Sequence, residues 1–320
     1  MKLSVFAVLL QDQSFDEACK YLSEQGVQAV EIGCGGYPGK AHCDPEALLK
    51  DPAQIDALRA TLSKYHLEIA ALSAHGNPVH PDPAIAKSFH DDFRNTVLLA
   101  EKLGVQTVVT FSGCPGGSPE DKTPNWVTCP WPEDFTKILD YQWNEVLIPY
   151  WKNEVEFLKA HGVRVAFEMH PGFCVYNPET LLRIRDAVGD TIGANFDPSH
   201  LFWQGIDPVA AIRYLGDAIY YFHAKDTKVD AINTARVGVL DTKPYSDEIN
   251  RAWVFRSVGY GNPHQTWKDI MSALRMVGYD GAISIEHEDS LMSATEGLGK
   301  AIAMLKDVMM FEGIGEMWWA

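Results

Sequence analysis

Short apolar runs recur along the whole chain, and a segment with helical periodicity separates each run from the next. The runs are rich in Val, Ile, Ala and Phe and end at polar, Gly or Pro residues, which is typical of strands in repeated strand–helix units. We predict eight strands, at residues 3–8, 29–33, 68–73, 107–112, 164–170, 192–197, 219–225 and 282–286. Strands that are apolar on both faces and alternate with helices form parallel sheets covered by helices.

Eight units is the number at which such a parallel sheet closes into a barrel. An open doubly wound sheet is the alternative, but no G-x-G-x-x-G pattern follows the first predicted strand. The sequence has neither a Pro/Ser-rich linker nor a break in composition that would divide its 320 residues. It therefore predicts an α/β fold, a single (β/α)8 TIM barrel over residues 1–320.

Two of the predicted strand-to-helix connections are much longer than the others. Residues 113–133 follow the fourth strand and contain Trp126, and residues 227–267 follow the seventh strand and contain Arg256. Extended loops in a compact domain usually form lids or binding elements. In a TIM barrel both would lie on the C-terminal face, where barrel enzymes carry their active sites.

The last four predicted strands end on side chains that can bind a metal ion, in the order Glu168, Asp197, His223 and Glu286. Because the C-terminal ends of neighbouring barrel strands surround one opening, we expect these four side chains to meet there. Three carboxylates buried together would be very costly unless a cation neutralised them. Oxygen-rich ligation with one imidazole suits Mn²⁺ best, and Mg²⁺ or Co²⁺ would also fit.

The same motifs resemble those of a known family, the xylose isomerase-like barrel superfamily, and particularly its sugar phosphate isomerase/epimerase branch. That branch includes ketose 3-epimerases, hydroxypyruvate isomerases and inosose dehydratases. The resemblance covers nearly the whole chain, and the motifs that carry it are Glu168, Asp197-Pro198-Ser199-His200, His223-Ala224-Lys225-Asp226 and Glu286.

The resemblance implies that Glu168 and Glu286 bind the metal and exchange a proton from opposite faces of the substrate. It implies further that Asp197 and His223 complete the metal site and that His200 binds the substrate. The implied activity is that of a divalent-metal-dependent sugar or keto-sugar isomerase or epimerase, working through a metal-stabilised cis-enediolate. The chemistry agrees, because a Lewis acid favours proton loss beside a carbonyl and two flanking carboxylates can take up and return the proton.

Further residues are candidates for contact with a small carbohydrate or keto-glycoside substrate. They are His75, His170, Arg256, Lys225 and Trp126. The Gly-rich segment after Glu31 is interpreted as a turn at the rim of the site, since its spacing fits neither a P-loop nor a dinucleotide-binding turn.

Three other functions are weighed against the isomerase. The long loops are similar to those of the large subunit of C-glycoside deglycosidases, so a metal-dependent lyase acting on 3-keto-glycosides, or a dehydratase, is the main alternative. An endonuclease IV-like DNA repair enzyme needs a basic surface, whereas this chain has 43 acidic and 27 basic residues and a net charge of -16. A non-catalytic binding protein would be expected to lose one of the paired glutamates, and both are present.

The sequence also gives expectations about partners and compartment. The acidic excess disfavours nucleic acid and anionic membranes as partners, and no apolar run approaches the ~20 residues that span a bilayer. The six cysteines form no C-x-x-C pair, which favours a reducing, cytoplasmic location. The C-terminal tail, residues 312–320, contains two adjacent tryptophans, Trp318 and Trp319, so we expect it to dock at an interface in a homo-oligomer or against a small partner subunit.

Overall fold

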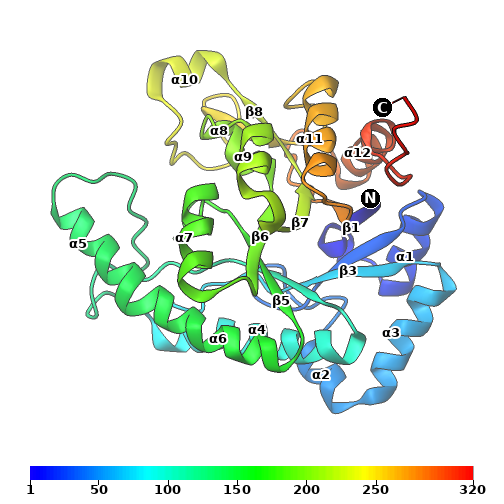
Figure 1. The fold of residues 1–320 in the computed structure, drawn as a ribbon, viewed down its shortest axis with the longest axis horizontal. Helices are drawn as coiled ribbons and strands as arrows, with labels where there is room; N and C mark the ends of the chain where they lie inside the picture. Colours follow the sequence, from blue (N-terminus) through cyan, green and yellow to red (C-terminus); the bar gives the residue numbers. More distant parts are fainter. Residues whose placement is uncertain (320) are drawn as a thin grey trace.

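The structure, a computed structural model, describes residues 1–319, and its main sheet is a closed barrel of eight parallel strands (Figure 1). The barrel strands are β1 (Lys2–Phe6), β2 (Ala29–Gly33), β3 (Glu68–Ser73), β4 (Thr107–Thr110), β5 (Arg164–Glu168), β6 (Ile192–Phe196), β7 (Ile219–Ala224) and β10 (Ala282–Ile285). They follow one another around the barrel in chain order, and β10 closes it against β1. The prediction of a (β/α)8 TIM barrel is confirmed.

Helices cover the outside of the barrel. They are α1 (Phe15–Glu24), α2 (Pro45–Lys50), α3 (Pro52–Lys64), α4 (Pro83–Leu103), α6 (Ile148–Ala160), α7 (Pro178–Val188), α9 (Pro208–Leu215), α11 (His264–Met276) and α12 (Ala294–Val308). The short α8 (Pro198–Trp203) follows β6 directly, is largely buried and packs against β8 (Asp226–Val229). Several begin with an Asp cap followed by proline, because the cap satisfies a free backbone N–H and proline has none to satisfy. In α4, for example, Asp82 accepts a hydrogen bond from Ala84 N at 2.8 Å.

The connection after β4 runs from residue 111 to 133 without a helix or strand and then enters a long, interrupted helix. This helix consists of α5 (Asp134–Asp140), the π-helical segment η2 (Tyr141–Leu147) and α6, and its α5 end projects from the barrel (Figure 1). Gln142, in the π-helical segment, donates to the carbonyl oxygens of Asn125 at 2.6 Å and Pro115 at 3.1 Å. The helix therefore holds the long loop in place.

The connection after β7 was predicted to be an extended loop, but the structure folds it into elements of its own. Strands β8 (Asp226–Val229) and β9 (Trp253–Arg256) form a two-stranded antiparallel sheet, and α10 (Ala231–Val237) lies between them in the chain. The Asp226 carboxylate accepts hydrogen bonds from the backbone N–H groups of Gly259 and Gly261. A Cβ on Gly261 would lie 2.4 Å from the Thr227 carbonyl oxygen, so only glycine fits this close approach.

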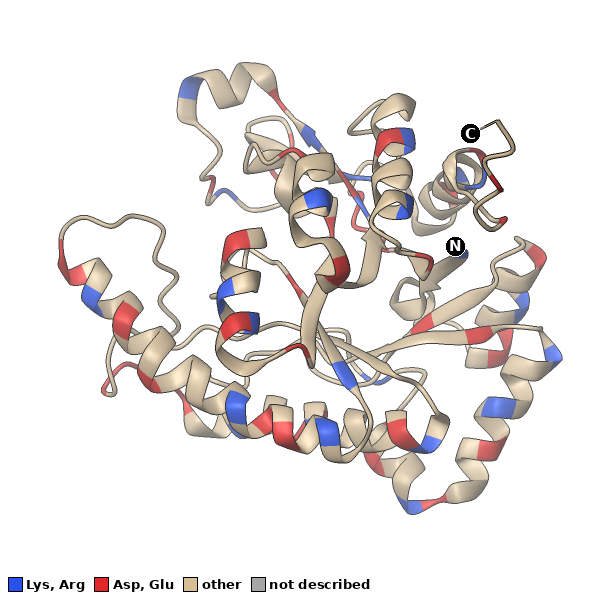
Figure 2. Cartoon of the chain, in the orientation of Figure 1, with Lys and Arg blue, Asp and Glu red and all other residues tan. Residues whose placement is uncertain are grey.

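Two 3-10 turns complete the described elements, η1 (Ala7–Leu10) after β1 and η3 (Gly216–Ala218) before β7. Acidic and basic side chains are intermixed along outer helices such as α3 and α6 (Figure 2). Within residues 1–319, no helix combines the length and the apolar composition needed to cross a bilayer.

The C-terminal tail follows α12 and is highly exposed in its described part, with Trp318 at 87% and Trp319 at 68% exposure. Ala320, the last residue of the predicted interface segment, lies outside the described residues.

Candidate metal centre

The structure brings together the four residues that the sequence placed at the ends of consecutive barrel strands. Glu168 is the last residue of β5, Asp197 follows β6, His223 lies near the end of β7 and Glu286 follows β10. One ligand atom of each lies within 4.8 Å of those of the other three. Because four separate strands supply these side chains, the hydrogen-bonded barrel fixes their relative positions.

The cluster has the properties that a divalent cation requires. Asp197 Oδ2 and Glu286 Oε2 are buried and accept no hydrogen bond from any residue of the described chain. Lys225 Nζ lies 3.2 Å and 2.8 Å from these two oxygens, without hydrogen-bond geometry. The three carboxylates outnumber this ammonium group, so the cluster keeps a negative charge that a divalent cation would neutralise. The donor set of three carboxylates and one imidazole fits such an ion.

Electrostatic coupling within the cluster is strong. Burial alone would lower the pKa of His223, but the carboxylates of Glu31, Glu168 and Glu286 raise it well above its ordinary value. Burial would raise the pKa of Glu168, but hydrogen bonds from His200, His223 and His75 hold it well below its usual range. The carboxylates thus favour positive charge at His223, which a metal ion bound at its ring nitrogen would supply in place of a proton.

Two histidines orient Glu168, the first of the two proposed acid/base carboxylates. His200, in α8, lies with Nε2 3.0 Å from Glu168 Oε1, and His75, just after β3, lies with Nε2 3.0 Å from Glu168 Oε2. Both rings are almost fully buried. His170 lies close by, with its ring centroid 4.1 Å from that of His200, and it forms a second group of metal-binding type with Glu168 and His200.

Glu31 belongs to this site as well, although the sequence predicts no role for it. It is fully buried in β2, and its Oε2 and Oε1 lie 2.9 Å and 3.0 Å from His223 Nε2. Ser284 donates to the same carboxylate at 2.8 Å, and Ser73 also hydrogen-bonds it. A carboxylate on one ring nitrogen commonly orients a histidine whose other nitrogen binds a metal. Here the other nitrogen, Nδ1, faces Glu286 Oε2 at 3.2 Å.

A cavity of about 200 Å³ lies over the cluster, and several of the predicted site residues line it: His75, Glu168, His170, Lys225 and Glu286. Arg256, which was also predicted to contact the substrate, does not line this cavity. Its Nε donates to Asp289 at 3.0 Å, and its guanidinium group lies 5.5 Å from the centre of the Tyr260 ring. Arg256 therefore helps to hold the segment after β9 against the segment after β10.

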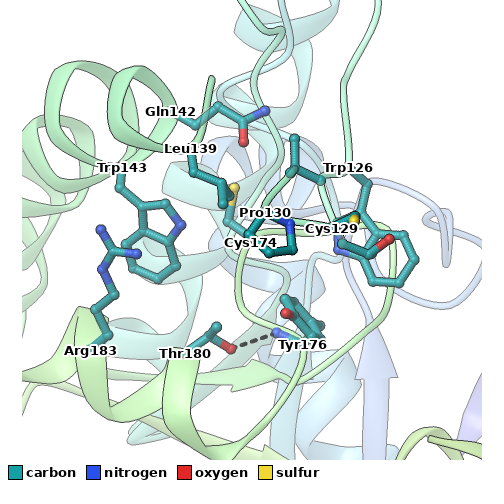
Figure 3. Close-up of a pocket in the computed structure, with 12 residues that line it drawn as sticks. Trp126, Cys129, Pro130, Leu139, Gln142, Trp143, Cys174, Tyr176, Thr180 and Arg183 are labelled. Atoms are coloured by element: carbon teal, nitrogen blue, oxygen red, sulfur yellow. Dashed lines mark hydrogen bonds between the residues drawn. The ribbon is translucent and has the colours of Figure 1, made fainter. Parts of the chain in front are cut away.

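Trp126 lies between two further cavities. One, of about 220 Å³, also has His170 and His200 in its wall and adjoins the metal cluster. The other, of about 240 Å³, lies under the long loop after β4, with Trp143 and Arg183 opposite (Figure 3). None of the four cluster residues lines this second cavity.

The barrel and the acidic cluster at its C-terminal face define a class of enzymes. Residues 19–308 match the family model described as xylose isomerase-like TIM barrel, so the chain belongs to this family. The chain is 39% identical over 312 residues to the uncharacterized protein YfiH of Bacillus subtilis (strain 168), an alignment that covers 97% of this chain and 99% of that protein.

Two more similarities extend the comparison. An inosose dehydratase of Mesomycoplasma hyopneumoniae is 26% identical over 275 residues, which covers 80% of this chain and 80% of the relative. The solved structure of a D-tagatose 3-epimerase-like protein matches with a TM-score of 0.63 at 21% identity, covering 96% of this chain and 98% of that one. The chain is thus similar to proteins that are named for different reactions, and it shares its fold with the second of them.

Proposed function

We propose that this protein is a divalent-metal-dependent isomerase or epimerase that acts on a sugar or keto-sugar, with Mn²⁺ as the metal. The observation that carries the proposal is the meeting of Glu168, Asp197, His223 and Glu286 beneath a cavity of about 200 Å³. These four residues would hold the ion. When bound, it would supply a Lewis acid that makes the carbon beside a substrate carbonyl more acidic.

Proton transfer is assigned to the two glutamates. Glu168 comes from β5 and Glu286 follows β10, and β6 and β7 separate these strands in the barrel wall. The two carboxylates therefore reach the cluster from different sides, as removal of a proton from one face and its return to the other require. His75 and His200 would hold Glu168 in position through their hydrogen bonds.

The remaining polar groups of the cavity would bind substrate oxygens. Burial and the neighbouring His200 lower the pKa of His170 to about 3, so its ring is neutral. Its Nδ1 lies 2.6 Å from the Pro171 carbonyl oxygen and donates to it, which leaves Nε2 to accept a hydrogen bond from a sugar hydroxyl. Lys225 lies beside Glu286 and would donate to a substrate oxygen.

The proposal is tested by incubating D-fructose, D-tagatose and D-psicose with the protein and Mn²⁺ in D₂O. We expect an isomeric product that carries one solvent deuteron, because the abstracted proton exchanges with solvent. Glu286→Gln should lower turnover by about 10²- to 10⁴-fold, whereas the exposed Glu156→Gln should not change it. Full activity after complete metal removal, or in Glu286→Gln, would contradict the proposal.

Elimination is the second candidate, and the similarity to a protein named inosose dehydratase favours it. The same two carboxylates would then remove a proton and protonate a leaving oxygen, so that water or an aglycone is released. Mass spectrometry separates the two candidates. A dehydrated sugar, or an aglycone released from a 3-keto-glycoside, indicates a lyase, and a product that differs from the substrate in mass only by a solvent deuteron indicates an isomerase.

A further inference from the structure

A group of aromatic side chains forms a second chamber beside the metal cluster. We call it the aromatic chamber. It has a volume of about 220 Å³, and the aromatic residues of its wall are Trp126, Trp203, Tyr245, Trp253 and Phe255. Most of these residues come from the segment that follows β7, which no barrel of eight strands needs for closure. The chamber is therefore an addition to the basic fold.

The aromatic chamber adjoins the proposed active site. His170 lines the cavity over the cluster, the aromatic chamber, and a third cavity of about 360 Å³ between them. Tyr245 and Phe255 are shared by the chamber and this third cavity. The Phe255 ring packs edge-on against His200, with centroids 5.4 Å apart, and its centre lies 4.8 Å from Lys225 Nζ. A ligand in the chamber would thus lie next to the reacting groups.

The chamber wall is held rigidly. Trp203 and Trp253 stack with their ring centroids 4.7 Å apart and their planes 5° from parallel. Trp253 Nε1 donates to the Val239 carbonyl oxygen at 2.9 Å. The Asp241 carboxylate accepts from Ala252 N at 2.7 Å, which ties the middle of the segment to the start of β9. A wall that is already ordered loses little entropy when it binds a ligand.

The chemistry of the wall combines flat apolar faces with hydrogen-bonding edges. Asp241 and Thr242 line the chamber, and Glu288 and Ser290 line the adjoining cavity. The indole N–H of Trp203, a residue with 5% exposure, has no acceptor in the described chain. A sugar ring matches this combination, because its C–H faces pack on aromatic rings and its hydroxyls bond with the polar edges.

We propose that the aromatic chamber binds a second sugar ring, so that the substrate is a disaccharide whose reacting ring lies over the metal cluster. The inference rests on the proposed function, and it specifies the substrate class. A free monosaccharide would occupy only the cavity over the cluster. A second, linked ring would pass His170 and reach the faces of Tyr245 and Phe255.

The test measures the affinity for sugars. The full-length protein with Mg²⁺ is titrated with maltose, cellobiose, lactose, sucrose and trehalose, and separately with glucose, galactose and fructose. Calorimetry gives the affinities, and tryptophan fluorescence reports occupancy of the chamber. The variant is Tyr245→Ala, since Tyr245 is 57% exposed and its loss should not unfold the chain. The matched control is Tyr214→Ala on α9, at 62% exposure.

We expect at least one disaccharide to bind about tenfold more tightly than its component monosaccharides. Tyr245→Ala should remove most of this difference, and Tyr214→Ala should leave it intact. The inference is overturned if no disaccharide gains affinity, or if the gain survives Tyr245→Ala. Tight binding of phenyl β-glucoside but of none of the disaccharides would also overturn it, because the chamber would then take an aryl group.

The binding titrations test the chamber assignment, and the D₂O incubation tests the proposed function, so either can fail without the other. If the protein converts a free ketose in D₂O but shows no preference for disaccharides, the chamber assignment fails and the proposed function stands. If a disaccharide binds through Tyr245 but no sugar exchanges a proton with solvent, the chamber assignment stands and the isomerase fails.

Discussion

Replacing Glu31 by Gln should weaken metal binding at the cluster without unfolding the barrel. The Glu31 carboxylate lies 2.9 Å from His223 Nε2, which sets the opposite nitrogen, Nδ1, toward Glu286 and the proposed ion position. Gln has nearly the same volume, and its amide can still hydrogen-bond Ser73 and Ser284. The substitution therefore removes the negative charge that holds the imidazole in place and leaves the packing unchanged.

The expected magnitude follows from this contact. Loss of a carboxylate that orients a metal-binding histidine typically costs about 10- to 100-fold in metal affinity or activity. This corresponds to about 1.4 to 2.8 kcal/mol of binding free energy. Because the defect is in affinity, saturating Mn²⁺ should restore most of the activity that Glu31→Gln loses at low metal concentration.

Calorimetric titration with Mn²⁺ measures the affinity, and thermal unfolding of the metal-free chain measures the effect on the fold. Glu68→Gln is the matched control, since Glu68 begins the neighbouring strand β3 but is exposed and pairs with Lys2. Unchanged Mn²⁺ affinity in Glu31→Gln would refute the reasoning. A large drop in the melting temperature together with unchanged affinity would show that Glu31 serves only the packing of the barrel.

Three further predictions concern the metal, the segment after β7 and the C-terminal tail. Dialysis against a chelator should lower the melting temperature and addition of Mn²⁺ should raise it again, because an ion that binds only the folded state stabilises that state. A melting temperature that does not change with metal would count against the metal site. Gly261→Ala should destabilise the protein by about 1–3 kcal/mol in urea unfolding, because the added Cβ would meet the Thr227 carbonyl oxygen. The control Gly299→Ala, in open space within α12, should stabilise the protein by up to about 1 kcal/mol. Equal effects of the two substitutions on stability would contradict this prediction. We propose that residues 312–320 form an oligomer interface, so their deletion should lower the mass measured by light scattering, and an unchanged mass would exclude that role.

The barrel could be predicted from the sequence because its strands are apolar on both faces and separated by helices. Each predicted strand lies within two residues of its observed position at either end. The sheet after β7 could not be predicted in the same way. Its strands have only four residues each, and Trp253 and Phe255 face a small cluster outside the main core. Such a sheet has too little regular pattern to be separated from a loop.

The metal cluster could be predicted from the sequence because strand order alone brings the ends of neighbouring strands together. The role of Glu31 could not be predicted in this way, because 192 positions separate Glu31 from its partner His223. The available signal was a charged residue within an otherwise apolar strand. The sequence makes Arg256 a candidate for substrate contact, but it contains nothing to show that Asp289 would pair with Arg256.

The two parts of the proposed site come from different parts of the fold, and this division has a consequence for specificity. The cluster residues lie at or just after the ends of barrel strands, which hydrogen bonds on both sides hold in register, so their geometry is tied to that of the core. Much of the aromatic chamber lies on the segment after β7, where Trp253 and Phe255 belong to a cluster separate from the main core. Substitutions in this segment can change which sugars bind while the proton-transfer groups stay in place.

Phe255 connects the aromatic chamber to the metal cluster, because it contacts both His200 and Lys225. A change at Phe255 should therefore affect turnover as well as binding, whereas a change at Tyr245, which lines the chamber but not the cavity over the cluster, should affect binding alone.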